Sequence, residues 1–122
     1  MRLPPLTLYG ITNCDSVKKA RAWLNDQAWP HEFHDFKKQG LSEALIDQWL
    51  ALVPWETLLN TRGTTWRQLS EAERAQGTTA AGARALLLAH PSLVKRPVLH
   101  NLSTNTLVVG VKPEEWLAWR SA

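Results

Sequence analysis

The chain contains a single cysteine, Cys14, within the stretch LTLYGITNCDSVKKARAWL at residues 6–24. A short apolar run ends at Gly10, and an amphipathic pattern begins directly after Cys14. This predicts a thiol at or next to the N-cap of a helix, where unpaired backbone N–H groups and the helix dipole favour an anion. In such positions the thiol pKa falls from about 8.5 to between roughly 3.5 and 7.5. The pattern indicates nucleophilic thiol chemistry, and Lys18, one helical turn further on, adds positive charge.

The alternative interpretation of Cys14 is a buried filler residue, because cysteine is among the side chains most often found in protein cores. Its polar neighbours, which include Thr12 and Asn13, favour the functional interpretation. Because the sequence has no second cysteine, an internal disulfide and a cysteine-rich metal site are both excluded. A disulfide formed by Cys14 must therefore include a thiol of another molecule.

Two arginines are further candidates for a binding site. Arg62 lies in a polar loop expected at residues 60–65, and a guanidinium suits bidentate contact with a carboxylate or an oxyanion, although a solvated role is equally open. Arg96 precedes Pro97 at the start of an expected β-hairpin, from which it could reach the N-terminus of the first helix and Cys14. The alternative for Arg96 is that it belongs to an isolated Lys-Arg pair on the solvent-exposed surface without a specific role, which is the more common case. The four histidines have no pattern of metal ligands, so we expect no metal site.

The elements that position these residues follow from the periodicity. A strand at residues 6–9, a helix from Asp15 to about Ala28 and a strand at 31–36 predict a parallel βαβ unit. Residues 41–92 show helical patterns, including a capping box at Ser70–Glu73, and no strand pattern. Strands at 98–100 and 107–109 and a helix from Pro113 complete the chain. We predict an α/β fold with 1–40 and 93–122 in one domain and 41–92 as a helical insertion, packed as one compact unit.

Composition limits the functional classes. The chain has 122 residues, a net charge of +3 and 44% hydrophobic residues, which fits one globular domain. The positive charges are scattered, so we expect no direct binding to nucleic acid. No segment has the form of a signal peptide or a membrane span. We expect a cytoplasmic monomer whose thiol stays reduced.

The sequence resembles the arsenate reductase (ArsC) and Spx-like family, and it is most similar to the YffB-like members. Three stretches carry the resemblance in order along the chain: LYGITNCDSVKKARAWL, LLNTRGTTWR at 58–67 and KRPVL at 95–99. The resemblance covers nearly the whole chain. It implies a thioredoxin-like fold with an all-helical insertion between its two halves, in agreement with the order of elements above.

The resemblance also implies residue roles. Cys14 matches the nucleophilic cysteine, Lys18 the basic residue that follows it, and Arg62 a basic residue of the insertion that closes over the active site. Arg96 matches the arginine before a cis-proline, which is Pro97 here. Arsenate reductases of this type use a further arginine in the second hairpin strand, where this chain has none at residues 106–111. This difference weakens the case for arsenate as the substrate.

Together these observations predict a glutathione-dependent thiol reductase in which Cys14 forms a mixed disulfide with glutathione. We expect Thr12, Asn13, Lys18, Arg62, Arg96 and Pro97 to bind the substrate or glutathione. Glutathione would be a co-substrate, a glutaredoxin would be a possible reducing partner, and no tightly bound cofactor is expected. One alternative is an arsenate reductase that uses glutathione and glutaredoxin. The non-enzymatic alternative is an Spx-like regulator that binds RNA polymerase, although position 17 is Val, so the C-x-x-C switch of such regulators is absent.

Overall fold

The computed structural model describes residues 3–121 and divides them into two units. The described residues up to Gln39 and from Arg96 onward form an α/β unit, and Gly40–Lys95 form a helical unit. Cys14 and Arg96 belong to the first unit and Arg62 belongs to the second.

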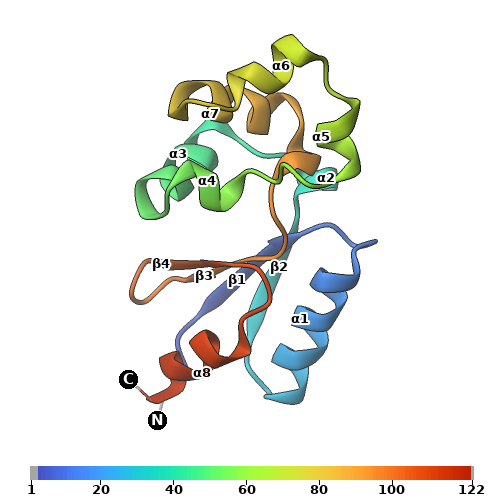
Figure 1. Ribbon diagram of the computed structural model, residues 1–122. Helices are drawn as coiled ribbons and strands as arrows, with labels where there is room; N and C mark the ends of the chain where they lie inside the picture. The colour runs from blue at the N-terminus through green and yellow to red at the C-terminus, as the bar shows by residue number, and fades with distance from the viewer. Residues whose placement is uncertain (1–2, 122) are drawn as a thin grey trace. The chain divides into compact units, whose positions relative to one another are not determined.

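A four-stranded sheet in the order β2-β1-β3-β4 forms the centre of the α/β unit (Figure 1). β1 (Leu6–Gly10) pairs in parallel with β2 (His31–Asp35), so that Gly10 lies opposite Asp35. β3 (Val98–Asn101) runs antiparallel to β1, and β4 (Thr106–Val109) runs antiparallel to β3. Because β1 and β2 are parallel, the residues that follow them emerge at the same end of the sheet, and Cys14 lies at that end.

Two helices, α1 (Asp15–Asp26) and α8 (Pro113–Ser121), cover one face of this sheet (Figure 1). On α1, the buried residues Val17, Ala20 and Leu24 recur at the spacing of one helix face. Ala20 and Leu24 pack with Trp116 of α8 and with apolar side chains of β1, β3 and β4 in one hydrophobic core. This core fixes the axis of α1 against the sheet, and with it the position of the helix N-terminus.

A glycine lets α1 approach the sheet closely at its N-terminal end. A Cβ atom at Gly10 would lie 2.6 Å from Cγ2 of Val17, closer than real Cβ contacts allow. Gly10 is the last residue of β1, and Val17 lies in the first turn of α1. The absence of a side chain at Gly10 therefore sets how near the helix N-terminus, and Cys14 with it, can come to the sheet.

The helical unit is built from short helices with defined N-caps. Ser42 caps α3 (Glu43–Leu52) and Thr79 caps α7 (Ala80–Ala89), while Ser70 and Glu73 form a full capping box on α6 (Glu71–Gln76). A bridge between Leu59 and Val94 joins the residue after α4 (Trp55–Leu58) to the segment that leaves the unit. The remaining elements of this unit are α5 (Thr64–Gln68) and the 3-10 turn η1 (Pro91–Leu93).

The structure confirms the α/β class and the βαβ–ββα order with helices between the two halves. It differs from the sequence-based expectation at short elements. β2 ends at Asp35, and the next four residues form a helix, α2 (Phe36–Gln39), which the sequence did not predict. Residues 64 and 65 were expected to lie in a loop but begin α5. Helices of four or five residues are too short to show the periodicity on which such predictions depend.

Candidate active site around Cys14

Cys14 is the N-cap residue of α1, as its place in the sequence predicts. Its backbone is extended, with φ −146° and ψ 123°, and its carbonyl oxygen accepts the first hydrogen bond of the helix from the Lys18 amide at 2.9 Å. The thiol is partly buried and is not in a disulfide. The sulfur makes no conventional side-chain cap bond, but the amides of Ser16 and Val17 are close enough to favour its anion.

The surroundings of Cys14 lower its pKa below the ordinary value of a thiol. Burial is the largest single effect and raises the pKa, because it disfavours the charged form. The backbone of Val17, the hydrogen bond and positive charge of Arg96, and the backbone of Ser16 act in the opposite direction and together outweigh it. The site therefore favours a thiolate, which is the nucleophilic form of cysteine.

Arg96 reaches Cys14 from the far end of the chain because β3 pairs with β1. The Arg96–Pro97 peptide bond is cis, and the Pro97 carbonyl accepts a hydrogen bond from the Gly110 amide at 2.8 Å. This hydrogen bond joins the segment before β3 to the segment after β4. Arg96 is partly buried, and its side chain hydrogen-bonds the Cys14 thiol. The structure thus brings together the cysteine and the arginine that the sequence analysis singled out.

The loop before Cys14 carries two further candidate residues, Thr12 and Asn13, both exposed. The Thr12 hydroxyl donates a hydrogen bond of 2.6 Å to Oδ2 of Asp35 at the end of β2. Asp35 was not among the residues singled out from the sequence, where it resembles one more polar residue of an alternating strand. Its capping role depends on the helix that begins at Phe36, which the sequence pattern does not predict, so no sequence signal identified it.

Lys18 lies on α1 one turn after Cys14, with an exposed side chain. Its backbone amide donates a hydrogen bond to the carbonyl oxygen of Cys14. The positive charge that lowers the pKa of Cys14 comes from Arg96 instead.

Arg62 belongs to the helical unit, in the turn between α4 and α5. Its amide donates to Oδ1 of Asn60 at 3.0 Å, and its carbonyl accepts from Nη2 of Arg67 at 2.7 Å. These bonds hold the turn and leave the Arg62 side chain exposed. Arg62 and Lys95 both line a hollow of 560 Å³ in this unit, which places two cations at one concave surface.

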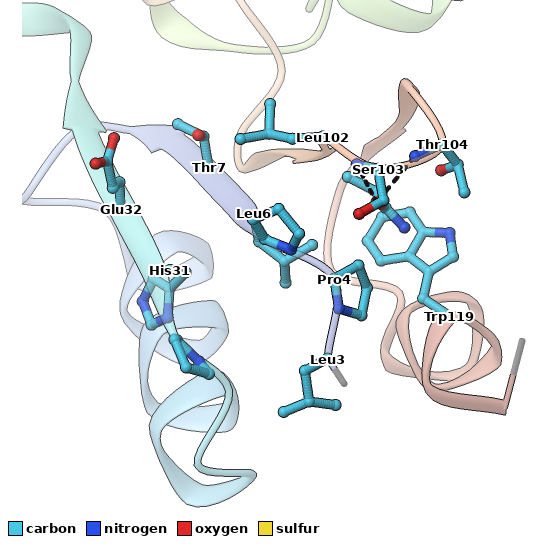
Figure 2. Close-up of a pocket in the computed structure, with 13 residues that line it drawn as sticks. Leu3, Pro4, Leu6, Thr7, His31, Glu32, Leu102, Ser103, Thr104 and Trp119 are labelled. Atoms are coloured by element: carbon cyan, nitrogen blue, oxygen red, sulfur yellow. Dashed lines mark hydrogen bonds between the residues drawn. The ribbon is translucent and has the colours of Figure 1, made fainter. Parts of the chain in front are cut away.

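The α/β unit has a hollow of 1010 Å³, shown in Figure 2, and Cys14 is not among its lining residues. It is lined by the first residues of β1 and β2, including Leu6 and His31, and by Trp119 of α8. Cys14 follows the opposite end of β1, and four strand steps of about 3.3 Å separate Leu6 from Gly10. Its lining contains no cysteine, so this hollow is not where the thiol would bind a substrate.

Among the described residues, 3–121, no cluster of three or more His, Cys, Asp or Glu side chains is arranged to hold a metal ion. None of the helices formed by these residues has the length and apolar character needed to cross a membrane.

Similarity to known proteins shows the family to which the chain belongs. The model of the ArsC family matches residues 9–119 of the sequence. The chain belongs to the ArsC family. Two curated relatives are a protein of Haemophilus influenzae, 36% identical over 93% of this chain and 96% of its own length, and the global transcriptional regulator Spx of Bacillus subtilis, 28% identical over 90% and 82%.

Solved structures agree with this ArsC-family assignment. The YffB (PA3664) protein is 42% identical with a TM-score of 0.85, covering 93% of this chain and 96% of its own. An arsenate reductase (ArsC) related protein from Brucella melitensis is 49% identical with a TM-score of 0.74, covering 97% and 96%. The chain thus has the thioredoxin-like fold of ArsC-family proteins and is similar to a YffB protein, as its sequence motifs indicated.

Proposed function

We propose that this ArsC-family chain is a glutathione-dependent thiol reductase with Cys14 as its nucleophile. The observation that carries the proposal is the thiol at the N-cap of α1, whose anion is favoured by the backbone of Val17 and Ser16 and by Arg96. Membership of the ArsC family supports an oxidoreductase function. We propose that it acts in the cytoplasm, where thiols are kept reduced.

The chemistry consists of two thiol–disulfide exchanges. The Cys14 thiolate attacks the glutathione sulfur of a glutathionylated substrate, forms a Cys14–glutathione disulfide and releases the substrate thiolate. Free glutathione, as thiolate, then attacks the glutathione sulfur of that disulfide, which releases oxidised glutathione and regenerates the Cys14 thiolate. The net reaction reduces one substrate disulfide and oxidises glutathione. Because the sequence has one cysteine, the second thiol must come from another molecule, either glutathione or a glutaredoxin.

The remaining candidate residues bind glutathione in this proposal. Arg96 and Lys18 offer positive charge to its carboxylates, for which a guanidinium is well suited. Arg62, in the helical unit, is a candidate from the family resemblance alone. Thr12 and Asn13 contribute polar groups beside the sulfur. The backbone at Arg96 and Pro97 pairs with the extended peptide in the manner of an added strand.

The test is covalent trapping. Incubation of the protein with oxidised glutathione is expected to give one glutathione adduct on Cys14, identified by intact mass and peptide mapping and reversed by reductant. The rate should follow the thiolate fraction and level off at a pH below the ordinary thiol pKa. Cys14→Ser is the matched control and should give no adduct. A titration of the Cys14 alkylation rate with a midpoint near or above 8.5 would contradict the activated thiol.

Arsenate reduction with glutathione and glutaredoxin is a second candidate. Two cations, Arg62 and Arg96, remain in the sequence to bind an oxyanion, and the chain is similar to a protein named as arsenate reductase related. Arsenate turnover by the pure protein with that reducing couple would support this candidate. Turnover no higher than that of Cys14→Ser would remove it.

A regulatory function is the non-enzymatic candidate, favoured by the similarity to the regulator Spx of Bacillus subtilis. It requires a surface that binds RNA polymerase. Purified polymerase and the tagged protein should co-elute if this function is present, with or without Cys14. Separate elution at micromolar concentrations of both would count against it.

A further inference from the structure

Asp35 is a buried carboxylate beside the loop that carries Cys14. It ends β2, lies opposite Gly10 in the sheet register and is 7% exposed. Burying a carboxylate is costly unless hydrogen bonds satisfy its oxygens. Within residues 3–121, no cation lies at ion-pair distance from Asp35. Its charge is instead satisfied by hydrogen-bond donors from two neighbouring segments.

The two oxygens of Asp35 bind different elements. Oδ1 accepts from the amides of Lys37 and Lys38, at 3.0 and 3.3 Å, and so caps the short helix α2. Oδ2 accepts from the Thr12 hydroxyl at 2.6 Å, the length of a charge-assisted O–H···O⁻ bond. One side chain thereby joins the start of α2 to the loop between β1 and α1.

The Asp35–Thr12 bond acts on a segment that is otherwise exposed. Between Gly10, held in the sheet, and Cys14, held by the first hydrogen bond of α1, the side chains of Thr12 and Asn13 are open to solvent. A buried anchor in the middle of this loop restricts how its backbone can move. The backbone direction at Cys14 then determines whether the thiol stays near Arg96 and the amides of α1.

We propose that Asp35 is a positioning residue for Cys14, acting through its hydrogen bond to Thr12. Asp35 does not touch the reacting sulfur. It fixes the loop so that Cys14 is presented at the helix N-terminus beside Arg96. The inference rests on the proposed function where it concerns catalysis, but the ordering of the loop is independent of any substrate.

The sharpest variant is Thr12→Val, which keeps the shape of the side chain, removes the hydroxyl and leaves the cap of α2 in place. Thr12→Ser restores the hydroxyl. The matched control is Thr106→Val, because the Thr106 hydroxyl also bonds a side chain, that of Thr104 at 2.8 Å, but in the β-hairpin. Asp35→Asn is a useful companion, since its amide can cap α2 and donate to the Thr12 oxygen.

Two readouts test the proposal. Amide hydrogen exchange of residues 11–16 should be about tenfold faster in Thr12→Val, the result of losing one hydrogen bond of roughly 1.4 kcal/mol. The rate of Cys14 alkylation at neutral pH should fall several-fold, with its pH midpoint moved upward. Thr12→Ser should stay near the wild type in both readouts, and Thr106→Val should match the wild type. Asp35→Asn keeps a hydrogen bond but not the negative charge, so it should lie between the wild type and Thr12→Val.

The outcomes separate this proposal from the proposed function. If Thr12→Val lowers the melting temperature but leaves loop exchange and Cys14 reactivity as in Thr106→Val, Asp35 is merely structural and the positioning role is overturned. If wild-type Cys14 alkylates as an ordinary thiol, the glutathione function fails, while the exchange measurement still decides whether Asp35 orders the loop. Faster amide exchange without any change in the alkylation rate of Cys14 would also overturn the proposal, because the order of the loop would then not affect the reactivity of the thiol.

Discussion

Arg96 hydrogen-bonds the thiol of Cys14 and places its positive charge beside it, although the whole helical unit separates the two residues in the sequence. Their meeting depends on β1, which leads to Cys14, pairing with β3, which follows Arg96. The nucleophile and the group that favours its anion are therefore delivered by adjacent strands of one sheet. This arrangement makes the reactivity of the thiol sensitive to residues remote from it in sequence.

Replacing Arg96 by alanine should raise the pKa of Cys14. Both the hydrogen bond and the charge of Arg96 favour the thiolate, so their loss moves the titration of the thiol to higher pH. At neutral pH the alkylation rate with iodoacetamide should fall several-fold, and at a pH well above the thiol pKa it should approach that of the wild type. The control is Lys95→Ala, which removes the charge of the neighbouring residue in the helical unit. It should leave the pH profile of Cys14 alkylation unchanged. Equal profiles for both variants would contradict the role of Arg96.

Gly10→Ala should destabilise the protein, because the added Cβ would lie 2.6 Å from Cγ2 of Val17. Overpacking of this kind costs about 1–3 kcal/mol in the free energy of unfolding, measurable by urea denaturation. The double variant Gly10→Ala with Val17→Ala makes room for the methyl group and should lose less than the sum of the two single variants. If the losses in the free energy of unfolding were strictly additive, the side chains at positions 10 and 17 would not restrict each other's space.

Trp116 and Leu117 are adjacent on α8 and should respond in opposite ways to truncation. Trp116 is fully buried, whereas Leu117 is 44% exposed. Trp116→Ala should cost about 3–5 kcal/mol, and Leu117→Ala should stay within about 0.5 kcal/mol. The indole Nε1 of Trp116 is buried without a hydrogen-bond partner in the described structure, so Trp116→Phe, which removes that donor, should lose clearly less than Trp116→Ala. Similar losses for the two alanine variants would refute this assignment of the core.

The acid stability of the α/β unit should depend on the hydrogen bond between Thr12 and Asp35. The Thr12 hydroxyl is the largest influence on the pKa of Asp35 and holds it below the ordinary value, assisted by the amides of Lys37 and Lys38. A depressed carboxyl pKa contributes stability that is present above the unfolded-state pKa and is lost as pH falls through the folded-state pKa. Thr12→Val should therefore be less stable than the wild type at neutral pH, and the difference should shrink once Asp35 is protonated. Urea denaturation at a series of pH values measures this, and a pH-independent difference would argue against it.

The sequence was sufficient to predict the sheet, the two long helices of the α/β unit and the place of Cys14. The N-cap position followed from a strand, a turn and an amphipathic pattern in immediate succession. The approach of Arg96 to Cys14 followed from topology, because a strand leading to one residue and a strand leaving the other were expected to meet. In each case a regular pattern of several residues determined the position of one side chain.

Asp35 and Gly10 could not be assigned in the same way. The role of Asp35 depends on which donors the fold brings to its two oxygens, and Thr12 reaches it only because β1 and β2 are parallel neighbours. At Gly10 the sequence indicated a turn, but the close contact with Val17 depends on the distance between α1 and the sheet. Such contacts are set by packing across elements, which a one-dimensional pattern does not contain.

The split of the α/β unit by the helical unit has a consequence for how the protein is made. A ribosome completes β1, α1 and β2 first, then all of Gly40–Lys95, and only then Arg96 and β3. A helix of 12 residues such as α1 is marginal without tertiary packing. The hydrogen bond and positive charge that Arg96 adds to the Cys14 site therefore become available only when the returning segment closes the sheet.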